Sequence, residues 1–464
     1  MRFNFLFLTT VFLFSFSPDI MSQGGGFGHY EPIKYSNPYM PWAQTFNHTK
    51  NKEDVAMALA VSPDGSIWVT GRVQNRSSGF DIVTVVYDPD GGTINDTNRF
   101  NGTGHGNDIP IDILFDKDSY CLVTGQTWGF GSAEDYLILK YDYSGEILWH
   151  WSYDGRFGAR DIPAEMAIDS SNTIVITGSS KTRPDEGLDY CTIKMHSSSQ
   201  PVLWESVYSG SGGGDDFAKS ITCDSKNNII VTGFSFEGFQ REYDMTTIKY
   251  DSLGNHKWTR RFNGGASQGD YGVKVIADSG DNAVVSGHSR TGSSNRDYMI
   301  VKYKPDGSQA WTYNYNGPVY KEDYASDMAL DINDNIYVTG RSRGLGDDFD
   351  FATLKLDPDG NLMWVHRYSS FWKSDDEAIA IVLDDSANVY VTGTSFDPFE
   401  GSTDIITLMY DTEGVLQWIR TYNGQGKDEP TGMAYDALEG LYIGGATFHS
   451  TVNDTDYLTI KYLP

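Results

Sequence analysis

Short runs of β-branched and aromatic residues, separated by turn-forming segments, recur along the chain. Residues 323–370 show the pattern clearly. Four apolar-rich runs lie at residues 325–330, 336–339, 351–356 and 362–368. The segments Asp331–Asn335 and Asp357–Gly360 between them are rich in residues that favour tight turns. The pattern therefore predicts four antiparallel strands joined as a meander.

This unit is repeated eight times, at steps of 52 to 55 residues. A glycine closes the second run of each copy: Gly71, Gly125, Gly178, Gly233, Gly287, Gly340, Gly393 and Gly445. Seventeen residues before each glycine lies an aspartate: Asp54, Asp108, Asp161, Asp216, Asp270, Asp323, Asp376 and Asp428. Ten or eleven residues after it lies another: Asp81, Asp135, Asp189, Asp244, Asp297, Asp350, Asp404 and Asp456. Four strands per repeat at this period predict an all-β fold, a β-propeller of eight four-stranded antiparallel blades over residues 39–464.

The two ends of the repeat array complement each other. The last repeat stops after its third strand, Tyr457–Tyr462, and lacks a fourth. Near the other end, Trp42–Asn47 matches the fourth strand of the preceding repeat, Trp418–Asn423. We therefore expect an N-terminal strand to close the last blade, which would remove an exposed sheet edge.

Two further patterns predict contacts that hold the blades. A Trp begins the fourth strand of most repeats and is interpreted as an anchor between blades: Trp149, Trp204, Trp258, Trp311, Trp364 and Trp418. The first repeat has Asp96 there instead. An Asp ends the first strand of seven repeats, and a Lys lies late in the third strand of six, which predicts an Asp–Lys contact. The first repeat has Ser62 and Val86 at these places.

Three segments carry a family resemblance: Val-Tyr-Val-Thr-Gly at 389–393, Asp-Tyr-Met-Ile-Val-Lys-Tyr at 297–303, and Trp-Thr-Tyr-Asn-Tyr-Asn-Gly at 311–317. They resemble the SBBP-type beta-propeller repeats of secreted proteins, over about residues 40–464. The family name implies seven blades, whereas eight repeats are present here. The resemblance implies no shared catalytic residues.

Charge and the N-terminal segment narrow the class of partner. The formal net charge of −28 argues against nucleic acid, which binds through clustered Lys and Arg, and favours cationic partners. Residues 1–22 are typical of a secretory signal peptide, and residues 23–38 of a flexible leader. No later segment is apolar enough to span a membrane. We expect a secreted protein, extracellular or periplasmic.

Candidate chemistry begins with the first aspartate series, Asp54 to Asp428. These eight carboxylates are expected to rim the mouth of the central channel. They could bind a cation or attract charged ligands. Their presence in every repeat favours a structural role instead, in which each accepts backbone N–H groups in its own loop. We therefore predict no metal site and no cofactor, with calcium as the alternative.

Aromatic residues in the loops between the second and third strands are the candidate ligand-binding residues. They are Trp128, Phe130, Phe236, Phe239, Phe396 and Phe399. Exposed aromatic side chains can stack on sugars or contact a protein, and they can equally cover their own blade.

Other motifs are interpreted as structural. Gly340–Gly344 matches Gly-x-Ser-x-Gly, but a nucleophile elbow needs a helix after the turn, and a strand is predicted here. The histidines show no zinc-binding spacing. Cys121, Cys191 and Cys223 are interpreted as buried free thiols.

The sequence thus favours a monomeric, non-enzymatic binding or scaffold propeller whose loop face takes a protein, glycan or cationic ligand. The alternative is a quinone-dependent dehydrogenase or another propeller enzyme. Tyr141–Trp149 and Tyr410–Trp418 read Tyr-Asp-x-x-Gly-x-x-x-Trp, which is similar to the tryptophan-docking motif of those eight-bladed, calcium-dependent enzymes. The chain has no adjacent Cys pair and no long insertion that would build their pocket.

Overall fold

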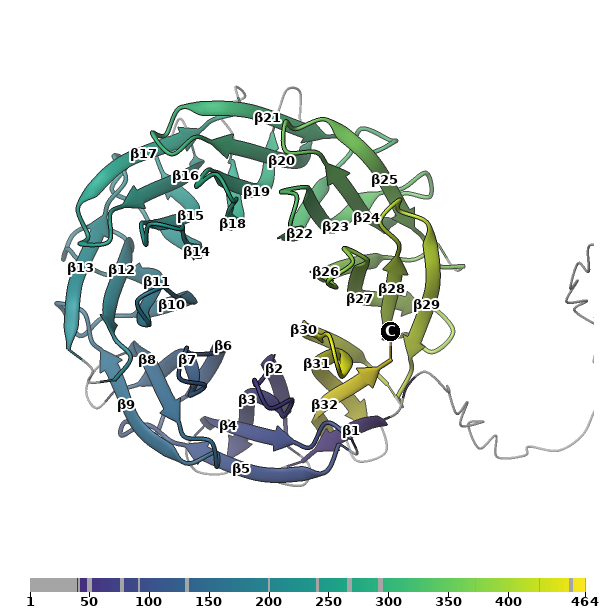
Figure 1. Ribbon diagram of the computed structural model, residues 1–464, viewed down its shortest axis with the longest axis horizontal. Coiled ribbons are helices and arrows are strands. Elements are labelled where there is room, and N and C mark those ends of the chain that lie inside the picture. The colour runs from purple at the N-terminus through teal and green to yellow at the C-terminus, as the bar shows by residue number, and fades with distance from the viewer. Residues whose placement is uncertain are drawn as a thin grey trace, which may run out of the picture. The chain divides into compact units, whose positions relative to one another are not determined.

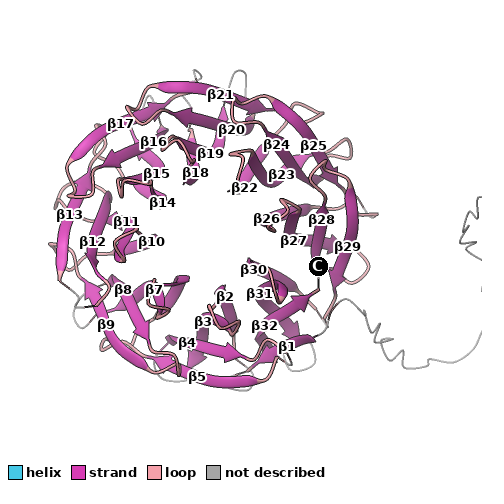
Figure 2. Ribbon diagram, viewed as in Figure 1, coloured by secondary structure: helices cyan, strands magenta, loops and turns pink. Residues whose placement is uncertain are grey.

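The chain folds as an eight-bladed propeller in a computed structural model. The structure describes residues 40, 42–47, 52–75, 79–90, 92–129, 133–198, 201–238, 242–264, 269–290, 295–371, 373–424, 426–449 and 454–463. Eight four-stranded antiparallel sheets are arranged radially around a common centre (Figure 1), and all regular elements of the described residues are strands (Figure 2). The predicted fold class is confirmed. The predicted signal peptide, residues 1–22, and leader, residues 23–38, lie outside the described residues.

Blades 1 to 4 follow each other along the chain, each running from the centre outwards. Blade 1 contains β2 (Asp54–Val61), β3 (Ile67–Asn75), β4 (Gly79–Tyr87) and β5 (Ile94–Phe100). Blade 2 contains β6 (Ile109–Phe115), β7 (Cys121–Trp128), β8 (Glu134–Tyr141) and β9 (Ile147–Tyr153). Blade 3 contains β10 (Asp161–Ile168), β11 (Thr173–Ser180), β12 (Asp189–His196) and β13 (Val202–Tyr208). Blade 4 contains β14 (Phe217–Cys223), β15 (Ile229–Phe236), β16 (Tyr243–Tyr250) and β17 (His256–Phe262).

Blades 5 to 8 complete the ring. Blade 5 contains β18 (Tyr271–Ala277), β19 (Ala283–Arg290), β20 (Arg296–Tyr303) and β21 (Gln309–Tyr315). Blade 6 contains β22 (Asp323–Leu330), β23 (Ile336–Arg343), β24 (Phe349–Leu356) and β25 (Leu362–Tyr368). Blade 7 contains β26 (Asp376–Leu383), β27 (Val389–Asp397), β28 (Ser402–Tyr410) and β29 (Leu416–Tyr422). Blade 8 contains β30 (Asp428–Asp436), β31 (Gly440–His449), β32 (Asp454–Tyr462) and β1 (Trp42–Phe46).

The last blade is closed as predicted, by the strand nearest the N-terminus. β1 pairs antiparallel with β32, from Trp42 opposite Lys461 to Phe46 opposite Tyr457. The indole of Trp42 is 7 % exposed and packs against the rings of Tyr87 in blade 1 and Tyr442 in blade 8. One short strand therefore completes a sheet and also joins the first and last blades.

The glycine that marks each repeat is required because the inner strand of its own blade, and in most repeats a side chain of the preceding blade, passes too close for a Cβ atom. A Cβ atom at Gly340 would lie 2.1 Å from the carbonyl oxygen of Tyr324 and 2.8 Å from the hydroxyl of Tyr298 in the preceding blade. That hydroxyl instead donates to the carbonyl of Ala352, at 3.1 Å. Only a residue without a side chain leaves room for this contact.

Each hydrophobic core lies between two blades. In one of them, Tyr298 and Ile300 of blade 5 pack with Ile336 and Val338 of blade 6. The middle strands of a blade are covered on both faces by its neighbours, so their side chains are buried without alternation. Burial thus accumulates one blade interface at a time.

Candidate functional site

The first aspartate series provides buried hydrogen-bond acceptors. Their exposed fractions are 0–1 %, so all eight carboxylates are buried. Asp108 shows the reason: its carboxylate accepts the N–H of Gly102 at 2.7 Å and the hydroxyl of Thr127 at 2.6 Å. In blades 2 to 8 the connection from the preceding blade folds over the carboxylate. Equivalent N–H donors are Gly155, Gly210, Gly264, Gly317, Ser370 and Gly424.

Burial changes the acidity of these groups. It raises the pKa of Asp323, Asp376 and Asp428 to about 6 in each case, against the hydrogen bonds that lower it. In the second series, burial and then the charge of Glu400 raise the pKa of Asp404 to about 7. These carboxyl groups therefore hold protons more tightly than they would in an unfolded chain.

The second aspartate series lies two strands further out, in register with the first. In blade 6, Asp323 faces Ser342 across one strand pair, and Ser342 faces Asp350 across the next. In blade 6 an outer-strand side chain neutralises the second carboxylate: the Arg367 guanidinium lies 2.7 Å from Asp350. In blade 4 the amide of Asn263 donates to Asp244 at 3.1 Å. The row is a structural network across the blade.

One group of carboxylates comes close enough together to hold a metal ion. Asp135, Asp154 and Asp161 each bring an oxygen within 4.8 Å of the others. It is the one such group among the residues that the structure describes. Asp154 occupies the position at which blade 4 has Asn263, so a carboxylate replaces an amide donor. The proximity of the three carboxylates alone does not identify a ligand.

The aromatic candidates occupy different environments. Trp128 is 37 % exposed and lies over Gly104 and Gly106, and Phe236 packs on Gly214 and Tyr243, so both cover nearby backbone or side chains. Phe396 is 36 % exposed and Phe399 77 %. Phe130 and Phe239 lie outside the described residues.

A second exposed group on the same face was missed in the sequence. Leu345, in the β23–β24 loop, is 91 % exposed, and Tyr320 and Phe371, in the connections on either side of blade 6, are 73 % and 85 % exposed. Leu345 and Lys373 line a hollow of about 310 Å³. Leu345 is not aromatic, and Tyr320 and Phe371 lie in connections between blades, so the pattern of aromatic residues in loops inside the repeats did not indicate them.

The remaining sequence motifs have structural places. Ser342 of the Gly-x-Ser-x-Gly match is buried within β23 and accepts a hydrogen bond from Arg367. Cys121 and Cys191 are buried and Cys223 is half-buried, all unpaired by disulfides. Burial raises the pKa of the Cys223 thiol to about 12. These cysteines are therefore poor nucleophiles.

The predicted anchor between blades consists of a Trp and a Lys that share one acceptor. Trp311 Nε1 and Lys302 Nζ of blade 5 both donate to the carbonyl of Pro358 in blade 6, at 3.1 and 2.9 Å. The same pairing joins Lys194 and Trp204 to Ser252, Lys355 and Trp364 to Thr412, and Lys461 and Trp42 to Pro89. The predicted Asp–Lys pairs are present in blades 2, 3, 4 and 5. In blade 8, Glu439 takes the role of the aspartate.

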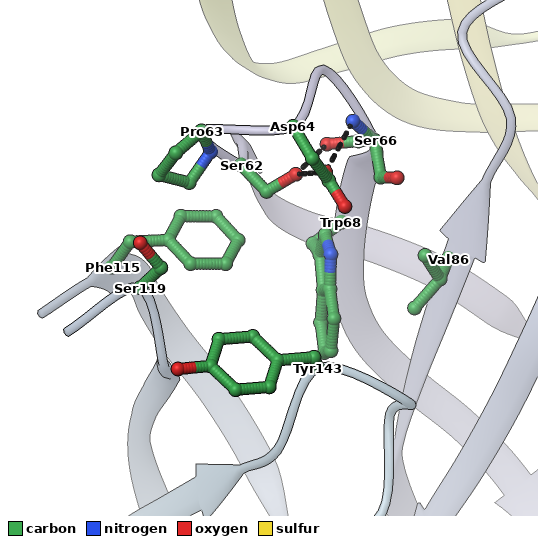
Figure 3. Close-up of a pocket in the computed structure, with 9 residues that line it drawn as sticks. All are labelled: Ser62, Pro63, Asp64, Ser66, Trp68, Val86, Phe115, Ser119 and Tyr143. Atoms are coloured by element: carbon green, nitrogen blue, oxygen red, sulfur yellow. Dashed lines mark hydrogen bonds between the residues drawn. The ribbon is translucent and has the colours of Figure 1, made fainter.

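The interface between blades 1 and 2 lacks this anchor and contains a cavity instead. Ser62, Val86 and Asp96 replace the Asp, Lys and Trp. A cavity of about 300 Å³ opens there, surrounded by the rings of Trp68, Phe115 and Tyr143 with Asp64 and Ser66 at its edge (Figure 3). The backbone N–H of Ser66 donates to Asp64 at 3.0 Å, and the Ser62 hydroxyl donates to the same oxygen. Other lining residues are Pro63, Val86 and Ser119.

Comparison with known proteins agrees with this architecture. Residues 319–349 match the SBBP family, a beta-propeller repeat, which confirms the predicted resemblance. An uncharacterized WD repeat-containing protein, L264 of Acanthamoeba polyphaga mimivirus, is 24 % identical over 469 residues, covering 75 % of this chain and 33 % of the relative. The chain thus spans about a third of that relative's length.

Two solved structures share the fold. Sqt1 of Chaetomium thermophilum has a TM-score of 0.58 at 11 % identity, covering 91 % of this chain and 98 % of its own. The quinohemoprotein alcohol dehydrogenase ADHIIG from Pseudomonas putida HK5 has a TM-score of 0.52 at 9 % identity, covering 91 % and 76 %. At such identities the likeness concerns the fold alone. Within the described residues, no helix is both long enough and apolar enough to cross a membrane.

Proposed function

We propose that this protein is a secreted, non-enzymatic binding propeller that docks a cationic protein partner on the face formed by its β23–β24-type loops and blade connections. The observation that carries the proposal is the exposure, 73–91 %, of Tyr320, Leu345 and Phe371, which lie in the β23–β24 loop of blade 6 and in the two connections beside it. Large apolar side chains gathered on one face of a folded domain are typical of a protein-binding surface.

Charge supports a basic partner. The chain carries a formal net charge of −28. Attraction to this charge accelerates the association of a positively charged protein, and added salt weakens that attraction. The hollow under Leu345 is lined by two carboxylates, Asp348 and Asp350, and by two cations, Arg367 and Lys373. The preference for a basic partner therefore rests on the net charge of the whole chain. A partner segment that combines Lys or Arg with aromatic or aliphatic residues would fit this surface.

A peptide-display selection on the purified protein tests the docking face. Peptides that contain both basic and apolar residues are expected to dominate, and the double variant Leu345→Asp/Phe371→Ser should bind them at least about tenfold more weakly, a loss of about 1.4 kcal/mol. Leu438→Asp is the matched control, because Leu438 is 93 % exposed in the β30–β31 turn at the opposite ends of the strands. Equal binding to the double variant would contradict the proposal, and a glycan array with the same variants tests a sugar ligand instead.

Secretion has its own experiment. The apolar run Phe5–Phe16 behind Arg2 is the basis of the proposed localisation. N-terminal sequencing of the exported protein should find the chain beginning near residue 22. Retention of uncleaved protein inside the producing cell would contradict it.

A further inference from the structure

The blade interfaces that contain the shared anchor each bind a lysine ammonium group of the chain itself. Each places a lysine ammonium against a backbone carbonyl of the next blade, as Lys302 does with Pro358. In blade 2 the Lys140 ammonium lies 2.7 Å from Asp116 and 2.9 Å from the carbonyl of Ser197. It also lies 4.4 Å from the centre of the Tyr120 ring. A carboxylate, a carbonyl and an aromatic face together form a site for an alkylammonium group.

The strand-two aromatic residue is part of this arrangement in other blades. Lys355 Nζ lies 4.9 Å from the centre of the Tyr337 ring, and Lys461 Nζ lies 5.4 Å from that of Tyr442. Trp68 holds the equivalent position in blade 1, second in its strand. Blade 1 therefore keeps the aromatic ring, and it is the largest of the three.

The acceptors at the interface between blades 1 and 2 also remain, without the lysine. Tyr143 follows Asp96 by the same 47 residues that separate Trp311 from Pro358, so its carbonyl is the counterpart of the shared acceptor. Among the described residues, no hydrogen bond to that carbonyl is formed. Val86 stands where the lysine would be, and the cavity of about 300 Å³ opens beside it.

The residues that line the cavity favour a positively charged ligand. Its lining has one carboxylate, from Asp64, three hydroxyl-bearing serines and three aromatic rings, and it contains no Lys, Arg or His. An anion would be repelled by Asp64 and would find no cationic side chain, whereas a cation would be attracted by that carboxylate and by the face of the Trp68 indole. The volume is at the lower end of the range for ligand sites, which suits a short chain with a single charged head.

We propose that the cavity between blades 1 and 2 binds a primary alkylammonium group, in the place that a lysine of the chain itself fills at other interfaces. The alkyl chain would pack on Trp68 and Phe115, and the ammonium would face Asp64 and the Tyr143 carbonyl. The group comes from a lysine side chain of a bound protein or from a free amine. The site does not rest on the docking face proposed above, because it lies at the opposite ends of the strands.

Calorimetric titration of the full chain with n-butylammonium, with Nα-acetyl-lysine methylamide and with uncharged n-butanol tests this proposal. The ammonium probe is expected to bind at least about tenfold more tightly than the alcohol. Equal affinity for lysine methylamide identifies a protein lysine as the natural source, and binding of butylammonium alone identifies a free amine. Equal binding of amine and alcohol, or binding of neither amine, overturns the proposal.

Two variants locate the site. Asp64→Asn removes the charge and keeps the oxygen that caps the turn, and it should weaken amine binding about fivefold or more. Asp306→Asn is the control, because Asp306 is exposed and caps Ser308 in the same manner, far from the cavity. Ser62→Asp/Val86→Lys installs the chain's own pair, which should abolish amine binding and raise the melting temperature. Undiminished amine binding by Asp64→Asn, or by a folded double variant, overturns the assignment.

Discussion

The Lys249 ammonium lies 2.7 Å from the Asp224 carboxylate, with both side chains at most 1 % exposed. Burial alone would raise the pKa of Asp224, but bonds from Lys249 and Asn228 outweigh it and hold that pKa below the usual value. The pair links the inner and third strands of blade 4, and its energy depends on both charges being present together.

Removing only the lysine should therefore be costly. Lys249→Met is expected to lower the free energy of unfolding by about 3–5 kcal/mol, because it leaves the Asp224 charge buried. Adding Asp224→Asn should recover much of that loss, and urea denaturation of the single and double variants measures it. Lys321→Met is the control: its pair with Asp347 is largely exposed, and the change should be within about 1 kcal/mol. Similar losses for Lys249→Met and Lys321→Met would contradict the expectation.

The tryptophan anchors predict opposite effects at two blades. Trp258 is 5 % exposed and donates to the carbonyl of Pro305 at 3.0 Å, so Trp258→Ala should cost about 3–5 kcal/mol. Asp96 occupies the equivalent place over Gly145, and Asp96→Trp should be neutral or stabilising. Calorimetric melting of both variants checks this. A fall in melting temperature for Asp96→Trp would show that blade 1 cannot accept the anchor.

Closure of the ring depends on β1. Deleting residues 1–48 removes the partner of β32 and should lower the melting temperature and cause association through the open edge. Deleting residues 1–37 leaves the β1 pairing in place and is the control. Light scattering after gel filtration measures the association. A monomer with an unchanged melt after the longer deletion would show that β32 needs no cover.

Stability should fall as the pH rises from about 5 to 8. The pKa values of Asp323, Asp376 and Asp428, about 6, and of Asp404, about 7, exceed the ordinary 3.8, so the folded state binds more protons in this window. Below about pH 4, groups with a lowered pKa such as Asp224 protonate, and stability falls again. Melting at pH 5 and pH 8 tests the sign, and Asp404→Asn should reduce the difference. A higher melting temperature at pH 8 would contradict it.

Calcium should change the melting temperature little, because the inner carboxylates already accept backbone N–H groups. Binding at a hundredfold excess over Kd would instead add about 2.7 kcal/mol. Calorimetry in millimolar calcium and in EDTA distinguishes the two outcomes. A large shift that disappears in Asp154→Asn, but persists in Asp270→Asn, would place an ion at the Asp135, Asp154 and Asp161 group.

The sequence predicted those parts of the molecule that repeat. Gly340 recurs in every blade because a strand carbonyl passes close to it each time, and Trp311 recurs in most blades because it meets the same turn of the next blade, so one repeat predicts the contact in its counterparts. The match of Trp42–Asn47 to Trp418–Asn423 predicted closure for the same reason.

The solvent exposure of individual side chains could not be predicted from the repeat pattern. Whether Asp108 faces solvent depends on how the connection through Gly102 folds over it, and that path has no periodic signal. Whether Leu345 is covered depends equally on loops of different length. Ser62 and Val86 were visible in the sequence as departures from the repeat, but the cavity beside them depends on how closely blades 1 and 2 pack, which the repeat pattern does not encode.

The seam between β1 and β32 also determines when the molecule can finish folding. Trp42 and its partner Lys461 are about 420 residues apart along the chain, the longest-range strand pairing in the ring. During synthesis β1 leaves the ribosome first, and it has no partner until β32 has been made. Blades 1 to 7 can form in order while β1 is still unpaired. Ring closure is therefore expected to be the slow, final step of folding. Until that step, the newly made protein presents an open edge to every other copy being made beside it.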